Sequence, residues 1–197
     1  WGAITGGTVS NNVHLGNAIK LKNGKLIAVE FRPTYLTPSN NITYPFDYYT
    51  SINNGDTWTK FTNGLVDFSP LAANGIRFHK GIIEEPDGTL YANAYVLYTP
   101  AASNPCRSYL LKSIDQGKTW KPTNPSSPVA IGSNTDESTL VRCKDGSWLV
   151  VMRQASAIDV YEPLLYSRST NKGVSWSTPA YLPGLGTGTA GQSIDPK

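Results

Sequence analysis

The chain has 197 residues, of which 16% are charged, and 17 Lys and Arg against 14 Asp and Glu give a formal net charge of +3. A charge this small, without any run of basic residues, gives no support for nucleic-acid binding and only mildly favours an acidic partner. The longest apolar runs are far shorter than the roughly 20 residues of a transmembrane helix. The 18 Gly, 14 Pro and 11 Tyr are typical of an all-β protein with many turns.

Three segments, taken in chain order, predict hairpins. Residues 18–29, 82–93 and 139–150 each consist of a strand pattern, an Asn-Gly or Asp-Gly pair and a second strand pattern. An Asn-Gly or Asp-Gly pair between such patterns is the strongest short-range hairpin signal.

An octapeptide S-x-[DN]-x-G-x-[TS]-W follows each of these hairpins, at 51–58, 113–120 and 169–176. Asn or Asp can hydrogen-bond the backbone two residues on, and Gly supplies a left-handed turn residue. The Trp suits the next strand, where a large ring can cover the seam between neighbouring sheets. The residues to which we assign this structural role are Asn53, Gly55, Trp58, Asp115, Gly117, Trp120, Asn171, Gly173 and Trp176.

Each repeat of roughly 60 residues therefore holds two hairpins, and four antiparallel strands per repeat predict the blade of a β-propeller. We expect a single propeller domain over 1–197, with blades at about 12–62, 76–124 and 134–180 and the start of a fourth at 190–197. Since propellers close with roughly four to eight blades, three complete ones predict an incomplete ring. We expect this ring to be part of a six-bladed propeller. The missing C-terminal blades would come from the same protein or a cleaved chain.

Hairpin symmetry predicts one functional rim, because residues equidistant from a turn lie side by side. It pairs Glu137 with Arg153, His79 with Tyr95 and His14 with Arg32, and it places Asp195 at the same level. We interpret His14, His79, Glu137 and Asp195 as candidate catalytic residues, and Arg32, Tyr95 and Arg153 as candidate substrate-binding residues. The alternative for Glu137 and Arg153 is a plain cross-strand ion pair worth under about 1 kcal/mol. Arg77 and Arg142 are further basic candidates that we do not favour.

The octapeptide resembles the Asp-box, or bacterial neuraminidase repeat, of the sialidase superfamily, and the resemblance extends over about 16–176. In that family the Asp-boxes lie away from the active site. The segment 136–153 resembles the sialidase segment that carries a Glu and an Arg. The resemblance implies that Glu137 polarises a nucleophilic Tyr and that Arg153 belongs to a triad that clamps the sugar carboxylate. The family's tyrosine and third arginine are expected in later blades.

His14 is a departure from the sialidase pattern, since it stands where that family carries the first arginine of the triad. Arg32 could supply this charge from the neighbouring strand. Two histidines at one rim suit acid/base work near neutral pH. We therefore expect an exo-acting glycoside hydrolase for acidic glycans, with Glu137 and Asp195 as its carboxylate pair.

Two alternatives stay open. One is a polysaccharide lyase that neutralises a uronate with Arg and abstracts its proton with His or Tyr, as in rhamnose–glucuronate lyases that resemble this propeller. The other is a non-catalytic glycan-binding propeller. Rim residues that differ between repeats favour one composite site, and hence an enzyme.

Other features of the sequence point to an extracellular protein without a cofactor. Two His and two Cys lack the spacing of metal ligands, so we expect no metal or cofactor. Cys106 and Cys143 fall at opposite ends of their repeats, and we expect two free thiols. A glycan-active propeller suggests a secreted or cell-surface location, where the sequon at Asn41 is a candidate for glycosylation.

Overall fold

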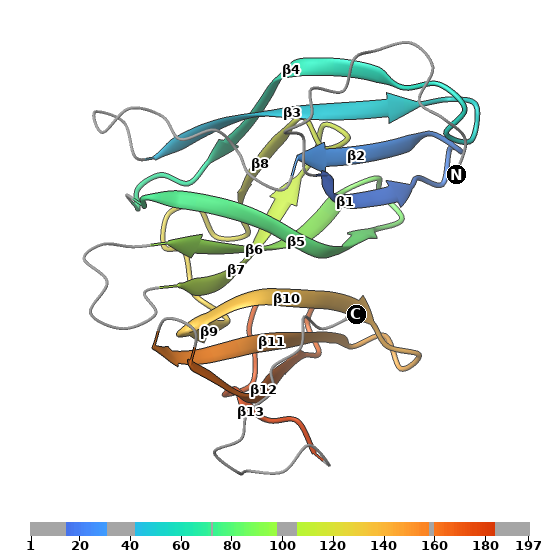
Figure 1. Cartoon of the computed structure of the whole chain (residues 1–197). Helices are drawn as coiled ribbons and strands as arrows, with labels where there is room; N and C mark the ends of the chain where they lie inside the picture. The colour runs from blue at the N-terminus through green and yellow to red at the C-terminus, as the bar shows by residue number, and fades with distance from the viewer. Residues whose placement is uncertain (1–14, 31–41, 72, 98–105, 158–159, 184–197) are drawn as a thin grey trace.

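The computed structural model describes residues 15–30, 42–71, 73–97, 106–157 and 160–183. Within these ranges the protein is all-β: 13 strands form one open sheet, and no helix occurs (Figure 1). The all-β prediction is confirmed. The described ranges contain no helix that is long and apolar enough to cross a membrane.

The strands form three successive antiparallel meanders, which lie one below another in Figure 1. The first meander consists of β1 (Leu15–Lys20), β2 (Leu26–Glu30), β3 (Thr43–Ser51) and β4 (Thr59–Asp67). The second consists of β5 (Gly75–Glu84), β6 (Leu90–Leu97), β7 (Arg107–Ser113) and β8 (Thr119–Pro122). The third consists of β10 (Thr135–Arg142), β11 (Trp148–Ala157), β12 (Val160–Ser169) and β13 (Ala180–Tyr181). The short β9 (Gly132–Ser133) pairs with β7.

Parallel pairing joins the meanders at two places. β4 pairs with β8, and β5 pairs with β10 through Lys80 and Thr139. β5 and β10 are the first strands of their meanders, so the two meanders approach each other along these strands. Residues near the beginning of β5 and β10 and near the end of β6 and β11 therefore lie at one end of the sheet, which we call the rim end.

Two hydrophobic clusters pack the meanders together. The larger lies between the first and second meanders, where the fully buried Trp120 meets Phe78 edge-on at 5.4 Å between ring centroids. The second lies between the second and third meanders, where Trp148 packs on Tyr91 at 4.9 Å. Truncating a core aromatic of this size typically costs about 3–5 kcal/mol, so these rings contribute strongly to stability.

The Asn-Gly and Asp-Gly turns form the predicted hairpins, but with three-residue loops. In the second meander, Gly88 N–H donates to Glu85 O at 3.0 Å and Glu85 N–H donates to Thr89 O at 2.8 Å. Gly88 has a φ of +83°, whereas Asp87 is not among the residues with positive φ. This is a type I turn followed by a left-handed glycine rather than the two-residue type I′ turn. Asp87 supports the turn by accepting the N–H of Thr89 at 2.9 Å.

The three octapeptide turns share one hydrogen-bond pattern. The serine hydroxyl accepts the glycine N–H in each turn: Ser51 from Gly55 at 2.9 Å, Ser113 from Gly117 at 2.9 Å and Ser169 from Gly173 at 2.8 Å. The Asn or Asp side chain accepts the backbone N–H of the Thr or Ser four residues on. The residue before each glycine is left-handed, with φ of 57° to 59°.

The second and third of these turns also contact the preceding meander. A Cβ atom on Gly173 would lie 2.2 Å from Leu110 Cδ2, and one on Gly117 would lie 3.0 Å from Ile27 Cδ1. Because Leu26 pairs with Ser51 and Trp148 with Ser169, the turns lie at the end of the sheet opposite the rim end. Strands of eight to ten residues separate the two ends by roughly 25–30 Å.

Candidate functional site

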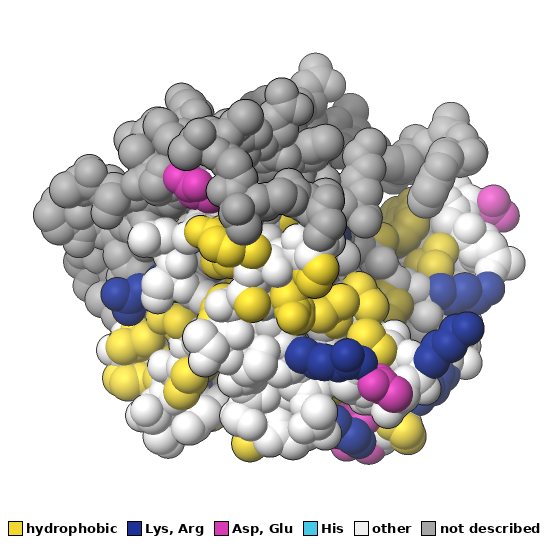
Figure 2. Space-filling view, turned by 90° about the horizontal axis from the view of Figure 1, so that it is seen from below, with side chains coloured by type: hydrophobic (Ala, Val, Ile, Leu, Met, Phe, Trp, Pro, Cys, Tyr) yellow, Lys and Arg dark blue, Asp and Glu magenta, His cyan; other side chains and the backbone are white. Residues whose placement is uncertain are grey.

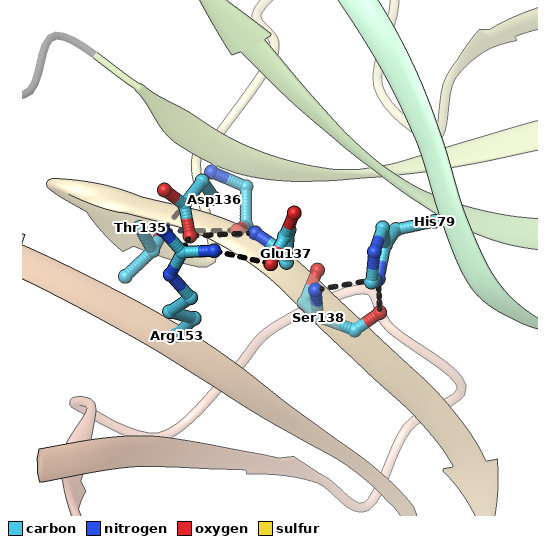
Figure 3. Close-up of polar contacts among 7 residues, drawn as sticks. His79, Thr135, Asp136, Glu137, Ser138 and Arg153 are labelled. Atoms are coloured by element: carbon cyan, nitrogen blue, oxygen red, sulfur yellow. Dashed lines mark hydrogen bonds and ion pairs between the residues drawn. The ribbon is translucent and has the colours of Figure 1, made fainter. Parts of the chain in front are cut away.

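An irregular stretch of β10 brings two adjacent carboxylates to one arginine. Ser138 pairs with Met152, but the register shifts between Ser138 and Thr135. In a regular strand, adjacent side chains would point to opposite faces, and a bulge re-aims one of them. Here Asp136 and Glu137 both reach Arg153 on β11 (Figure 3).

Arg153 is held by ion pairs on two of its nitrogens. Its terminal nitrogen donates to Glu137 Oε2, and its Nε lies 3.7 Å from Asp136 Oδ1. The side chain of Arg153 is 17% exposed, against 14% for Asp136 and 26% for Glu137. Partial burial reduces solvent screening, so the electrostatic attraction between Arg153 and Glu137 is stronger than that of an exposed ion pair. The contact between Glu137 and Arg153 agrees with the hairpin symmetry; their chemical roles stay predictions.

Tyr95 faces Arg77, and the expected pairing of Tyr95 with His79 is wrong. Arg77 pairs with Tyr95 across β5 and β6, and the register then shifts between Phe78 and Ile82. β5 carries extra residues in this stretch, so a count from the Asp-Gly turn misplaces everything beyond it. The ring centroids of His79 and Tyr95 lie 6.4 Å apart.

Arg77, Tyr95 and Cys106 extend the charged cluster across the second meander. Burial raises the pKa of the Tyr95 hydroxyl far above its usual value; nearby Arg77 lowers that pKa, whereas Glu137 and Asp136 raise it. Burial, assisted by Asp136, likewise raises the pKa of the Cys106 thiol to about 12, although Arg77 and Arg153 lower it. The two arginines and the two carboxylates therefore lie near Tyr95 or Cys106 at the rim end.

His79 lies beside this cluster but uses one ring nitrogen on the backbone. Its Nδ1 is 3.0 Å from Ser138 N and 2.8 Å from Ser138 O, and its side chain is almost fully buried (Figure 3). Ser138 directly follows Glu137 in β10. His79 therefore bridges the second and third meanders.

Three of the predicted site residues, His14, Arg32 and Asp195, lie outside the described residues, as does Asn41. Four come together at the rim end: His79, Tyr95, Glu137 and Arg153. Sequence reasoning missed Asp136 and Cys106 and set Arg77 aside. Gly81 was an available signal, because a glycine inside a strand pattern often marks a bulge.

Neither a metal site nor a disulfide occurs among the described residues. No group of three or more His, Cys, Asp or Glu that could hold a metal ion is found there. Cys106 is buried and Cys143 is partly buried, and both are free thiols.

A pocket of about 370 Å³ lies away from the charged cluster, on β7 and β8. Lys112, Ile114, Lys121 and Pro122 contribute to its lining. It includes one carboxylate, Asp115, which is already used in the octapeptide turn. It offers neither an aromatic platform nor a pair of carboxylates, so we place the candidate site at the rim end instead.

Comparison with known proteins finds no matching family model and no matching curated protein. Solved structures do match. An α-L-arabinofuranosidase of Fusarium graminearum in complex with arabinobiose has a TM-score of 0.61 and 18% identity, over 86% of this chain and 48% of that chain. The Hadza microbial sialidase has a TM-score of 0.58 and 16% identity, over 81% and 31%. An ulvan lyase bound to a GlcA–Rha3S repeat has a TM-score of 0.52 and 10% identity, over 85% and 43%.

These neighbours are β-propeller enzymes that act on glycans, and at such low identity they show the fold alone. Sialidases are one group among them, beside arabinofuranosidases and a polysaccharide lyase. The chain spans about half the length of the arabinofuranosidase and less of the other two.

Proposed function

We propose that this chain is part of a β-propeller glycoside hydrolase that binds an acidic sugar at the rim end. The observation that carries the proposal is the cluster of Arg153, Arg77, Asp136 and Glu137, which shares one end of the sheet with the partly buried Tyr95. Shared architecture with glycoside hydrolases supports enzyme activity at a general level.

The guanidinium groups suit recognition of a carboxylate. Arginine presents a planar fork that matches a carboxylate with two hydrogen bonds. Asp136 and Glu137 fix the Arg153 fork in place before any ligand arrives, which reduces the entropy lost on binding. A glycoside hydrolase also needs a pair of carboxyl groups across the scissile bond. Glu137 is our candidate for one of them, and Asp195 is the sequence-based candidate for the other.

A lyase is the second candidate, because two arginines could neutralise a uronate and lower the barrier to loss of its C5 proton. The ulvan lyase among the structural neighbours is bound to a glucuronate-containing repeat. The raised pKa of Tyr95 weighs against this tyrosine as the base in the free protein, because the neutral phenol donates protons. We therefore keep the hydrolase first.

We further propose that the three meanders are blades of a six-bladed propeller and that their octapeptide turns are Asp-boxes. The third meander supports further blades, since its outer surface carries hydrophobic side chains beside Lys and Arg (Figure 2). Val141 and Tyr181 are 38% and 48% exposed in this meander. A neighbouring blade would cover such a face, as the second meander covers the first. We also propose a secreted or cell-surface location, in keeping with a glycan substrate.

An activity screen tests the proposal. The protein is incubated with sialosides, uronic-acid polysaccharides and arabinan, and new reducing ends and absorbance near about 235 nm are followed, the latter reporting an unsaturated uronate. The hydrolase predicts reducing ends without absorbance, with at least a 100-fold loss in Glu137→Gln, as expected for removal of an acid/base group. Arg168→Lys is the matched control, because Arg168 pairs with Asp145 at the opposite end of the sheet.

Each other outcome changes the conclusion. Absorbance together with reducing ends would replace the hydrolase by the lyase. Binding of an acidic glycan without turnover would leave a non-catalytic binding protein. The absence of both binding and turnover on every glycan tested would refute the proposed function.

A further inference from the structure

We propose that His79 is a positioning residue that holds the Glu137 carboxylate against Arg153, rather than an acid or base that acts on substrate. The proposal deepens the proposed function and rests on it for the activity readouts. It starts from the backbone of Ser138, which directly follows Glu137 in the chain and lies between Glu137 and the His79 ring in Figure 3.

The His79 ring contacts the backbone of Ser138, where β10 changes from irregular to regular pairing with β11. Ser138 begins the regular ladder with β11, and the register shift that re-aims Asp136 and Glu137 lies immediately before it. The imidazole Nδ1 lies within hydrogen-bond distance of both the N–H and the C=O of Ser138. A neutral Nδ1 can accept the N–H, and a protonated Nδ1 can donate to the carbonyl. In either form the ring fixes this residue.

Side chains from two other strands hold Ser138 and the backbone around His79 by further hydrogen bonds. Asn93 on β6 donates its amide to the Ser138 hydroxyl, so Ser138 is held from both strands of the second meander's first hairpin. Asn17 on β1 donates to His79 O and accepts the N–H of Gly81 at 3.2 Å. The network thus links all three meanders, and it is buried, where each hydrogen bond is costly to break.

The geometry separates this role from acid/base catalysis by ring atom. Positioning uses Nδ1, which faces the Ser138 backbone, whereas acid or base catalysis by this residue would have to use Nε2. Asn carries its polar atoms near the place of Nδ1, and Gln carries them near the place of Nε2. His79→Asn should therefore keep the contact with Ser138, and His79→Gln and His79→Phe should lose it.

The test measures hydrogen exchange and kinetics on the same set of full-chain variants. We expect His79→Phe and His79→Gln to speed exchange of the amides of residues 137–139 about 10-fold, the effect of one lost hydrogen bond. β7 should exchange unchanged. With a substrate from the activity screen, we expect kcat of His79→Phe and His79→Gln to fall about 100-fold, because a small misplacement of a catalytic group such as Glu137 costs this much. His79→Asn should stay within about fivefold of the parent in both readouts.

Tyr44→Phe is the matched control, since it removes another buried hydrogen bond, from Tyr44 to Ala73 O at 2.6 Å, in the first meander. It should leave exchange of 137–139 and kcat unchanged. The proposal is overturned if exchange of 137–139 is unaffected in His79→Phe and His79→Gln. It is also overturned if His79→Asn and His79→Gln lose the same limb of the pH–rate profile, since that marks acid/base chemistry. Absence of any glycan activity would refute the proposed function, and the exchange data would still decide the positioning role.

Discussion

Replacing Gly81 by alanine tests how closely β5 approaches β10 at the junction of the second and third meanders. Gly81 has a φ of +92°, and a Cβ there would lie 2.1 Å from Leu140 O and 3.0 Å from Leu140 N. Carbon contacts are favourable only near 3.5–4 Å, so the two strands would have to separate by more than about 1 Å. Gly88 provides the matched control, because its φ is +83° but nothing lies within 4 Å of a Cβ.

The two substitutions share the backbone strain and differ in the clash. Alanine in the left-handed region costs about 1–2 kcal/mol, and this is the whole cost expected for Gly88→Ala. Overpacking adds typically about 1–3 kcal/mol, so Gly81→Ala should lose about 2–5 kcal/mol of unfolding free energy. Urea unfolding followed by Trp fluorescence measures both variants. Equal losses, within about 0.5 kcal/mol, would refute the close approach of β5 and β10.

Three further predictions concern the turns, the thiols and alkaline pH. Ser113→Ala should cost about 1–3 kcal/mol in urea unfolding, because the buried glycine N–H loses its acceptor. Asp115→Asn should change stability by less than about 0.5 kcal/mol, since Asn serves in the other two turns; a large loss would contradict the shared pattern. Cys143 should react with a thiol reagent in the native protein and Cys106 only after unfolding, because burial raises the Cys106 pKa to about 12; equally fast reaction would contradict this. Burial raises the pKa of Tyr44 to about 12, so the unfolded chain, with a tyrosine pKa near 10, loses the proton first. Stability should therefore fall as pH rises from about 10 to 12, less steeply in Tyr44→Phe; parallel curves would contradict the assignment.

The turns could be predicted from sequence because their causes are local. The Asp87 side chain and Gly88 lie next to each other in the chain, and together they supply the hydrogen bond and the left-handed residue that close the hairpin. The same holds for Ser113 and Gly117 in the octapeptide turn. The all-β class follows from these turns.

The site could be predicted only where the strands are regular. The pairing between Arg142–Trp148 and Ser138–Met152 keeps one register, so the count from the turn leads correctly to Glu137 and Arg153. Counting residues from the turn fails in β5. There the left-handed Gly81 packs against Leu140 of the next meander, and its N–H donates a hydrogen bond to Asn17 of the preceding meander. Gly81 marks an irregularity but does not give the size of the register shift, so the count from the turn placed Arg77 two residues before the rim.

The account's central claim, that the rim end binds an acidic sugar, is tested most directly by NMR of the arginine side chains. Glucuronic acid and glucose are titrated separately into protein labelled with ¹⁵N-arginine, with signals assigned through Arg153→Lys and Arg77→Lys. We predict that glucuronic acid shifts the Nε–H signals of Arg153 and Arg77, that glucose leaves them in place, and that the Arg168 signal is unchanged by either. Shifts confined to Arg168, or no shift of Arg153 and Arg77 at saturating glucuronic acid, would contradict the claim.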